Sequence, residues 1–342
     1  MRFLPTPEQT DFTRTLRSLL GAAEVPTTVR AWAAGDHAPG RALWARLADT
    51  GLWALAVPED GPYGELGGLG PLPVEAALGF VELGRAGFAG PAVETAAACV
   101  LLAGLGDTGC AKRYLPALVA GEASATLTLP GGSPYALDAD AATYRFTVSA
   151  RGELRLADGA GTPLASLDPA RRLSTLDPGG GELLAAGPDV TRAAETALCW
   201  ARLLTAAQCL GVGEALLART VEYTKQRTQF GTPIGAFQAV KHRLADTLLA
   251  LEFARPLLWA AALSPRPGEV AAAKLTAGEA AYAAALTALQ LHGAVGYTEE
   301  LDLSLWLRKA RPLRDAWGTP TACRAEVLRS GVGGGVPWGG VG

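Results

Sequence analysis

The stretch YTKQRTQFGTPIGAFQAVKHRLAD, residues 223–246, separates two long helical patterns. Apolar residues recur at helical spacing over 191–227, a range that runs into the start of this stretch. That spacing predicts an amphipathic helix. Pro233 and the glycines beside it end the pattern, and further helices are expected over 236–263 and 269–292. Long helices joined by short connections predict antiparallel packing in a bundle.

The same stretch carries polar groups that suit a nucleotide. Arg227, Gln229 and Phe230 lie at the end of the predicted helix, and Gln238 lies in the helix that follows. A guanidinium pairs with phosphate, and an aromatic ring packs against a heterocycle. Spacing alone leaves a second interpretation open, in which a helix ends with its usual cation and is followed by a breaker.

A second segment that could contact a ligand is LQLHGAVGYTEE, residues 289–300, which contains the end of the third predicted helix. Its small residues Gly293, Ala294 and Gly296 would let the backbone approach a ligand closely. The alternative is an ordinary glycine C-cap. Spacing alone does not decide between the two.

The rest of the chain divides into regions of different pattern. Roughly the first 120 residues are helical patterns broken by Gly and Pro. Over 123–188, short and partly alternating segments such as YRFTVSARGELRLAD are separated by Gly, Pro and Asp, which indicates strands and turns. We expect a fold that is mainly α with a small middle β-domain. The predicted regions are a helical domain over 1–122, a shortened β-domain over 123–190, a four-helix bundle over 191–330 and a disordered, glycine-rich tail over 331–342.

Composition excludes several classes of protein. The formal charge of −3 and the absence of a long Lys/Arg run give no footprint for nucleic acid. No uninterrupted apolar run reaches the roughly 18 residues of a membrane span, and the N-terminus lacks the apolar core of a signal peptide. The five scattered cysteines indicate small buried hydrophobes in a reducing compartment, so a cytoplasmic location is expected. None of the three histidines follows a glutamate at the spacing of a di-iron bundle, so no metal is expected.

Taken together, the two quoted segments resemble the acyl-CoA dehydrogenase family. Residues 223–246 are similar to its Tyr-Ala-x-x-Arg-x-Gln-Phe-Gly-x-x-Ile…Gln segment, and residues 289–300 to its Gln-x-x-Gly-Gly-x-Gly-Tyr segment. Weaker similarities, such as GLWALAVPEDGPYGELGGLG over 51–70, extend over nearly the whole chain. The resemblance implies an α-domain, a β-domain and a C-terminal four-helix bundle, with FAD as cofactor and α,β-desaturation of an acyl-CoA as the reaction.

The resemblance also assigns expected roles to residues. Arg227 would reach the FAD pyrophosphate, Gln229 and Phe230 would line the adenosine side, and Gln238 belongs to the same motif. The ADP portion would be contacted by Gln290, Gly293 and Gly296, and Thr319 matches a family threonine close to the flavin. In the family these contacts cross a subunit interface, so an oligomer is implied.

The catalytic glutamate of the family has no counterpart. When RKARPLRDAWGT, residues 308–319, is laid on the family's segment without gaps, Trp317 falls on the glutamate. An indole has no basic nitrogen and cannot remove a proton. Some relatives carry the glutamate on the first bundle helix instead, where this chain has Ala201. A relocated base could be Asp315 or Glu214, although Asp315 is expected to pair with Arg311 or Arg314, and Glu214 to lie at the solvent edge of its helix.

The β-domain also departs from the family. The Thr-Glu-Pro-x-x-Gly-Ser motif is represented only by TLPGGS, residues 128–133, and the Trp-Ile-Thr strand along the flavin has no clear match. The chain resembles the short, base-lacking subunit of heteromeric actinobacterial acyl-CoA dehydrogenases, which pairs with an intact chain. Three hypotheses follow: a subunit that completes the FAD site of a homologous catalytic partner, a self-sufficient dehydrogenase with a relocated carboxylate that assembles with itself, or a non-enzymatic scaffold.

Overall fold

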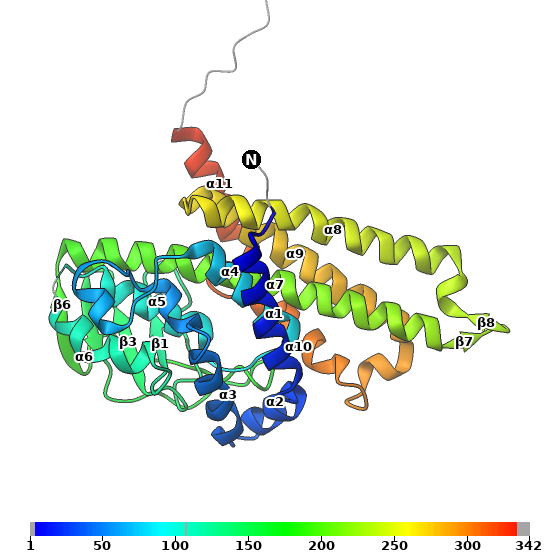
Figure 1. Ribbon diagram of the computed structural model, residues 1–342, viewed down its shortest axis with the longest axis horizontal. Coiled ribbons are helices and arrows are strands. Elements are labelled where there is room, and N and C mark those ends of the chain that lie inside the picture. Colours follow the sequence, from blue (N-terminus) through cyan, green and yellow to red (C-terminus); the bar gives the residue numbers. More distant parts are fainter. Residues whose placement is uncertain (1–3, 107, 334–342) are drawn as a thin grey trace, which may run out of the picture.

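The computed structural model describes residues 4–106 and 108–333 of the chain (Figure 1). Six helices precede the strands: α1 (Pro7–Gly21), α2 (Val25–Ala33), α3 (Ala38–Ala48), α4 (Pro73–Ala86), α5 (Ala92–Ala103) and α6 (Thr108–Val119). The strands β1 (Ala125–Thr128), β2 (Ala136–Leu137), β3 (Tyr144–Val148), β4 (Glu153–Leu156), β5 (Leu173–Ser174) and β6 (Glu182–Ala186) follow. The C-terminal part contains α7 (Pro188–Gln226), β7 (Thr228–Gln229), β8 (Thr232–Pro233), α8 (Gln238–Leu263), α9 (Pro267–His292), α10 (Leu303–Asp315) and α11 (Pro320–Gly333).

The predicted fold class is confirmed: the molecule is mainly helical with a small β region. The long helices begin and end within three residues of the predicted positions, because their apolar spacing runs nearly to their ends. The predicted tail over 334–342 lies outside the described residues. The remaining part of that tail, 331–333, completes α11.

The N-terminal helices share one apolar core with the bundle. Trp44 and Trp53 stack in this core with ring centroids 4.0 Å apart, and Trp53 is fully buried. Helix α4 crosses α7 so closely that a Cβ on Gly84 would lie 2.2 Å from the Gln208 carbonyl oxygen. Gly211 meets α4 in the same way, since its Cβ would lie 2.0 Å from the Val81 carbonyl oxygen. Glycine is therefore required at this crossing.

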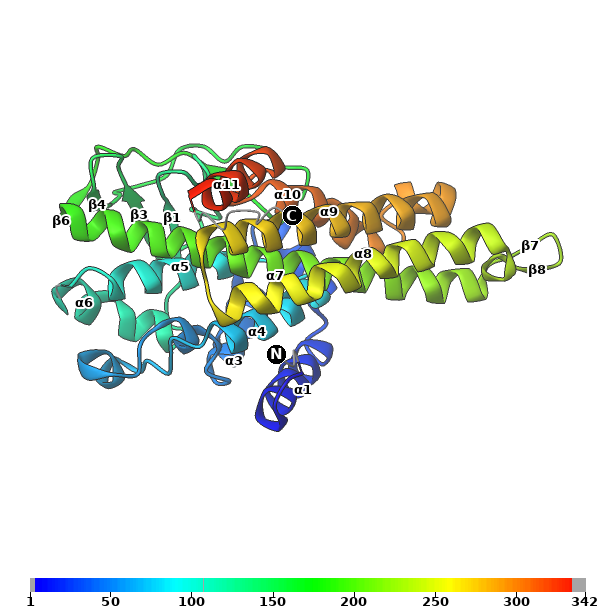
Figure 2. The same cartoon turned by 90° about the horizontal axis from the view of Figure 1, so that it is seen from above.

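The β region is one four-stranded sheet and a smaller pair. The order of the larger sheet is β1-β3-β4-β6, with β1 parallel to β3 and the other pairs antiparallel, and β2 pairs with β5. Thr95 of α5 fixes this sheet to the helical core, because its hydroxyl accepts the Ala125 N–H and donates to the Ala125 carbonyl. In the view of Figure 2 this sheet lies at one end of the molecule and the β7–β8 hairpin at the other.

The bundle is built around α7, which runs through the molecule from the sheet to the hairpin. This helix is long and apolar enough to cross a membrane by composition, and most of its apolar window is buried inside the fold, as in the core helix of a bundle. It packs against α4, α5, α8, α9 and α10, so it joins the N-terminal helices to the bundle.

Candidate functional site

The two motif segments meet at the hairpin end of the bundle. Tyr223, one turn before the end of α7, stacks on His292 at the end of α9, with ring centroids 4.1 Å apart. The Tyr223 hydroxyl also donates to the His292 carbonyl at 3.4 Å. This pair brings the segment around Arg227 and the segment from Gln290 to Gly296 to the same end of the molecule, although they are far apart in sequence. Gln238, the first residue of α8, lies at this end as well.

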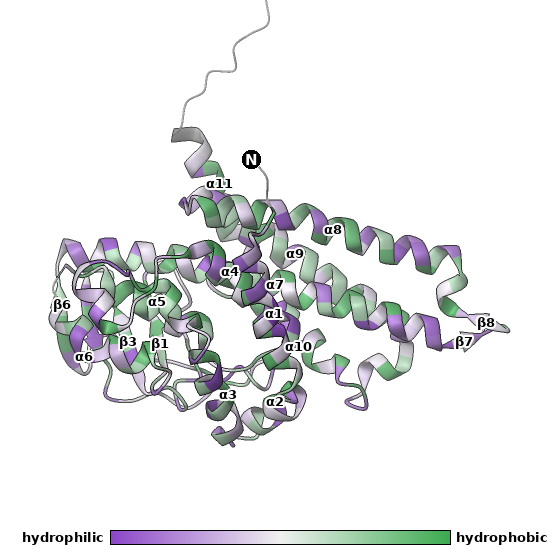
Figure 3. Cartoon of the chain, viewed as in Figure 1, coloured by the Kyte–Doolittle hydropathy of each residue, from purple (hydrophilic) through white to green (hydrophobic). Residues whose placement is uncertain are grey.

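Side chains at this end point into solvent. Phe230 is 94% exposed and has a φ of 53°, a left-handed conformation that is uncommon for an aromatic residue. Arg227 is exposed and makes no ion pair or side-chain hydrogen bond with the described residues. Gln229 and Gln238 are exposed too, and hydrophilic residues gather at this end of α7 (Figure 3). The ring and the guanidinium are therefore both free to contact another molecule.

The glycines after α9 have different roles in the segment. Gly293 has a φ of 62°, and a Cβ there would meet nothing within 4 Å. Its backbone is therefore open to an approaching ligand. Gly296 is buried, and a Cβ there would lie 3.2 Å from the His292 and Leu289 side chains. Gly296 thus lets this turn pack closely, while Gly293 leaves its surface bare.

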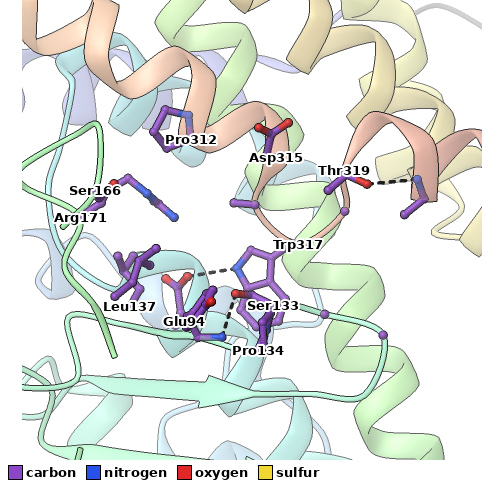
Figure 4. A pocket seen from close by; sticks show the side chains of 17 residues that line it. Glu94, Ser133, Pro134, Leu137, Ser166, Arg171, Pro312, Asp315, Trp317 and Thr319 are labelled. Atoms are coloured by element: carbon purple, nitrogen blue, oxygen red, sulfur yellow. Dashed lines mark hydrogen bonds between the residues drawn. The ribbon is translucent and has the colours of Figure 1, made fainter. Parts of the chain in front are cut away.

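Thr319 lies elsewhere, in a cavity of about 390 Å³ between the β region and the start of α11. The loop Gly131–Ser133, the first turn of α5, the segment before β5 and the connection from α10 to α11 line this cavity (Figure 4). The structure therefore separates Thr319 from the other expected cofactor residues. One set lies at the hairpin end, and Thr319 lies in the cavity at the sheet side of the bundle.

Trp317 forms part of the cavity wall. Its side chain is 3% exposed, and its indole Nε1 donates to Oε1 of Glu94 at 3.0 Å. A Cβ on Gly132 would lie 2.9 Å from the indole ring, so only glycine leaves room for it. Its φ is 58°, and the Arg202 Nε donates to its carbonyl at 2.9 Å. The buried Lys274 ammonium donates to the Arg314 carbonyl and holds the same loop from the other side.

Glu94 is a carboxyl group in this cavity that the motif comparison did not find. It lies in the first turn of α5 and is 3% exposed. Burial raises the pKa of Glu94, and the nearby charge of Arg171 opposes that rise. A signal for it exists in the sequence, because Glu94 is the single charged residue in the helix AVETAAACVLLA.

The other carboxylates considered as bases have partners. Oδ1 of Asp315 accepts from Arg314 Nε at 3.1 Å, as expected, and Asp315 lies at the cavity rim. The expectation that Glu214 lies at the solvent edge is wrong: its side chain is 10% exposed and pairs with Arg85 and Arg255. Glu214 can stand in the apolar stripe of α7 because Arg85 of α4 and Arg255 of α8 pair with its carboxylate.

Ala201 is fully buried within α7, so this position supplies no base. Among the described residues, no group of three or more His, Cys, Asp and Glu side chains could hold a metal ion.

The residues at the hairpin end suit the binding of a nucleoside diphosphate. It offers an unpaired guanidinium, exposed amides on Gln229, Gln238 and Gln290, and open backbone at Gly293. Guanidinium groups and backbone N–H groups are the donors that bind phosphate in proteins. The residues present are therefore compatible with the ADP portion of FAD. At the cavity, by contrast, the Trp317 indole occupies the space beside the Gly131–Ser133 loop.

Comparison with known proteins gives the family. Residues 6–122 match the model of the acyl-CoA dehydrogenase N-terminal domain, and residues 191–331 match that of the C-terminal domain. The acyl-CoA dehydrogenase IpdE2 of Mycobacterium tuberculosis is 36% identical over 95% of this chain and 96% of its own length. The chain belongs to the acyl-CoA dehydrogenase family. These enzymes are oxidoreductases acting on CH–CH bonds, and their cofactor is FAD.

Solved structures of acyl-CoA dehydrogenases share the whole fold. Butyryl-CoA dehydrogenase from Megasphaera elsdenii superimposes with a TM-score of 0.82 at 23% identity, covering 97% of this chain and 100% of that one. A chain of the ChsE4-ChsE5 complex from Mycobacterium tuberculosis gives a TM-score of 0.82 at 26% identity, with 97% and 99% covered. The N-terminal helices, the sheet and the bundle are therefore arranged as in the family.

Proposed function

We propose that this chain is the base-lacking subunit of a heteromeric acyl-CoA dehydrogenase, and that it completes the FAD site of a catalytic partner. One observation carries the proposal. The position of the family glutamate holds Trp317, whose buried indole hydrogen-bonds to Glu94 and packs against Gly132. The space in which the family's base would meet substrate is thus filled by a side chain without basic character.

The hairpin end retains what the cofactor needs. Arg227 would hold the pyrophosphate, Phe230 and Gln229 would cover the adenosine, and Gln290 and Gly293 would offer an amide and open backbone. FAD, when bound, supplies the hydride acceptor of the desaturation. The protein residues bind and orient it, and the partner supplies the proton acceptor. This division explains why the cofactor motifs persist where the base does not.

Exposed apolar side chains on α8 support the proposal of a partner subunit. Leu249, Phe253 and Leu257 recur at every fourth position of α8 and are 53%, 70% and 41% exposed. Phe230 of the hairpin is a further exposed apolar side chain. Contiguous exposed apolar surface of this kind marks protein–protein interfaces. The ChsE4-ChsE5 neighbour is itself a complex of two differently named chains, which supports a heteromeric assembly.

The experiment is co-expression with a longer family member that keeps its glutamate, followed by measurement of flavin per heterodimer. Arg227→Ala should weaken FAD binding by about 10- to 100-fold, the value of a charge-assisted hydrogen bond. Arg192→Ala is the matched control, because Arg192 lies at the opposite end of α7 and is 73% exposed. Its flavin content should equal that of the unaltered complex.

Two outcomes contradict the proposal. The first is a chain that purifies alone as a flavin-loaded homo-oligomer with full dehydrogenase turnover. The second is normal flavin loading of the complex by Arg227→Ala, which would favour a scaffold that takes no part in cofactor binding.

A second candidate function rests on Glu94. This buried carboxyl lines the cavity, and burial raises its pKa above the usual value of a glutamate. The chain would then be a dehydrogenase with a relocated base on α5. Glu94→Gln in the complex separates the two functions. Turnover that falls by about 10²–10⁴ identifies Glu94 as the base, whereas turnover that persists until the partner's glutamate is replaced assigns the base to the partner.

A further inference from the structure

Arg172 joins the N-terminal helices to the β region. Its Nη1 donates to the Trp32 carbonyl at 3.0 Å, near the end of α2, and its Nη2 contacts Nε2 of His37, just before α3. Nη2 also pairs with Asp140 at 2.8 Å. Arg172 Nε is buried and has no hydrogen-bond partner among the described residues. The guanidinium is therefore the point at which the connection between α2 and α3 is held against the segment before β5.

The backbone of Arg172 is fixed within the β region. Its N–H donates to Asp138 Oδ1 at 3.0 Å, and its carbonyl accepts the Asp138 N–H at 2.6 Å. The residues on either side of it, Arg171 and Leu173, line the cavity described above. The contact between Arg172 and His37 thus connects one wall of that cavity to the N-terminal helices.

The contact with Arg172 requires a neutral imidazole on His37. A guanidinium donates hydrogen bonds and accepts none, so Nε2 of His37 must be the ring nitrogen that carries the lone pair. A proton on Nε2 removes this acceptor and places a second positive charge against the guanidinium. The half-buried imidazole also packs against the Trp32 ring, with centroids 4.6 Å apart. This packing limits the water that could stabilise a charged imidazole.

The other charged groups around His37 do not balance a third cation. Arg172 approaches it from the β region and Arg41 from α3, while the two carboxylates are Asp140 after β2 and the adjacent Asp36. Asp140 already pairs with Arg172, and Asp36 accepts the first N–H of α3. Burial and the charge of Arg172 lower the pKa of His37 below its ordinary value of 6.5, although the two carboxylates oppose that shift.

We propose that the contact between His37 and Arg172 is a pH-sensitive switch. Neutral His37 holds the connection between α2 and α3 against the segment before β5, and protonation of His37 in mildly acidic solution releases it. The switch goes beyond the proposed function, since it acts within this chain and requires neither FAD nor a partner subunit. Its release would loosen one wall of the cavity from the N-terminal helices.

The test is native-state hydrogen exchange of the full chain, measured by mass spectrometry at about pH 7.5 and about pH 5.5 and corrected for the chemical exchange rate. The segments 31–38 and 168–173 meet at this contact, and their exchange is compared with that of His37→Gln, whose neutral amide can accept from Arg172 at either pH. The ratio of the two exchange rates should rise by up to about tenfold at the lower pH, the limit for one histidine over this interval. Asp138 titrates in the same range, and both chains keep it, so the ratio reports His37 alone.

Two further variants complete the comparison. His37→Arg carries a permanent positive charge, so both segments should exchange at about pH 7.5 at least as fast as the unaltered chain does at about pH 5.5. His242→Gln is the matched control, because His242 is exposed on α8. Its pH response should equal that of the unaltered chain.

An NMR titration of the imidazole ring protons provides a second measurement. The chain has three histidines, so the signal lost in His37→Gln identifies His37. Its pKa should lie below 6.5, and Asp140→Asn should lower it further because a nearby carboxylate is lost. The proposal is overturned if the exchange ratio is the same at both pH values, if His37→Arg keeps the protection of the unaltered chain at about pH 7.5, or if His37 titrates at or above 6.5.

Discussion

The buried ion pair between Lys309 and Asp168 gives the sharpest stability prediction. Its two side chains are each 4% exposed, and the Lys309 Nζ lies 2.7 Å from Asp168 Oδ2. The pair joins α10 to the segment that carries Arg171. Lys309→Met keeps the length of the aliphatic chain and leaves the carboxylate buried without a cation. Removing one partner of such a pair typically costs about 3–5 kcal/mol in the free energy of unfolding.

The assay is urea unfolding followed by circular dichroism, with a double-mutant cycle. Asp168→Asn is the second arm, because its Oδ1 can still accept the Ala170 N–H while the charge is lost. The double variant should be more stable than the sum of the two single losses implies, since it leaves no unpaired buried charge. Arg30→Met is the matched control: Arg30 pairs with Asp302 at 2.6 Å, with side chains 46% and 44% exposed. An exposed pair of this kind contributes about 0–1 kcal/mol.

The reasoning would be refuted if Lys309→Met and Arg30→Met lowered the stability equally. Burial would then have no influence on the strength of these pairs in this protein. A double-mutant cycle with no coupling energy would be equally damaging, because it would show that Lys309 and Asp168 stabilise the fold through other contacts.

Further predictions concern the buried carboxyls and the hairpin. Burial raises the pKa of Asp138 from 3.8 to about 7. Between these two pH values the native state therefore binds more protons than the unfolded state. The free energy of unfolding should fall as pH rises through this window, by up to about 4 kcal/mol. Asp138→Asn should flatten that dependence in urea unfolding, and an unchanged slope would contradict the assignment. Trp317→Phe should cost about 1–3 kcal/mol because it leaves Glu94 Oε1 without its donor, and most of that cost should vanish in a Glu94→Leu background; equal losses in both backgrounds would argue against the bond. Phe230→Ala should leave the thermal midpoint of the isolated chain unchanged while weakening its association with the partner in sedimentation, and a lowered midpoint would show that the ring stabilises the chain itself.

The long helices could be predicted because helical periodicity is a local property of sequence. The patterns over 191–227, 236–263 and 269–292 correspond to α7, α8 and α9, which begin at Pro188, Gln238 and Pro267. The meeting of the two motif segments at one end followed from bundle topology, since α7 and α9 end on the same side. The conformation of Phe230, at a φ of 53°, did not follow from any pattern.

The cavity could not be predicted, because its contacts join residues that are distant in sequence. Trp317 and Glu94 are 223 positions apart, and Lys309 and Asp168 are 141 apart. The resemblance predicts that Trp317 stands at the position of the family glutamate, and the carboxyl that hydrogen-bonds to the indole, Glu94, comes from the N-terminal helices. Similarly, Glu214 was expected in solvent because its own helix shows only an interrupted stripe, while the cations that bury it belong to α4 and α8.

Under the proposed function, the contacts of Trp317 determine whether a glutamate at its position could act as a base. Glu94 now accepts the indole N–H, and Gly132 leaves the room that the ring needs. A glutamate restored at position 317 would place a second carboxyl within reach of Glu94 in a buried site, where two negative charges raise each other's pKa. It would also leave a void where the indole had been. Under the proposed function, a change to a self-sufficient enzyme would therefore require coordinated substitutions in the two domains that meet at the cavity, and a single substitution would first give a less stable protein.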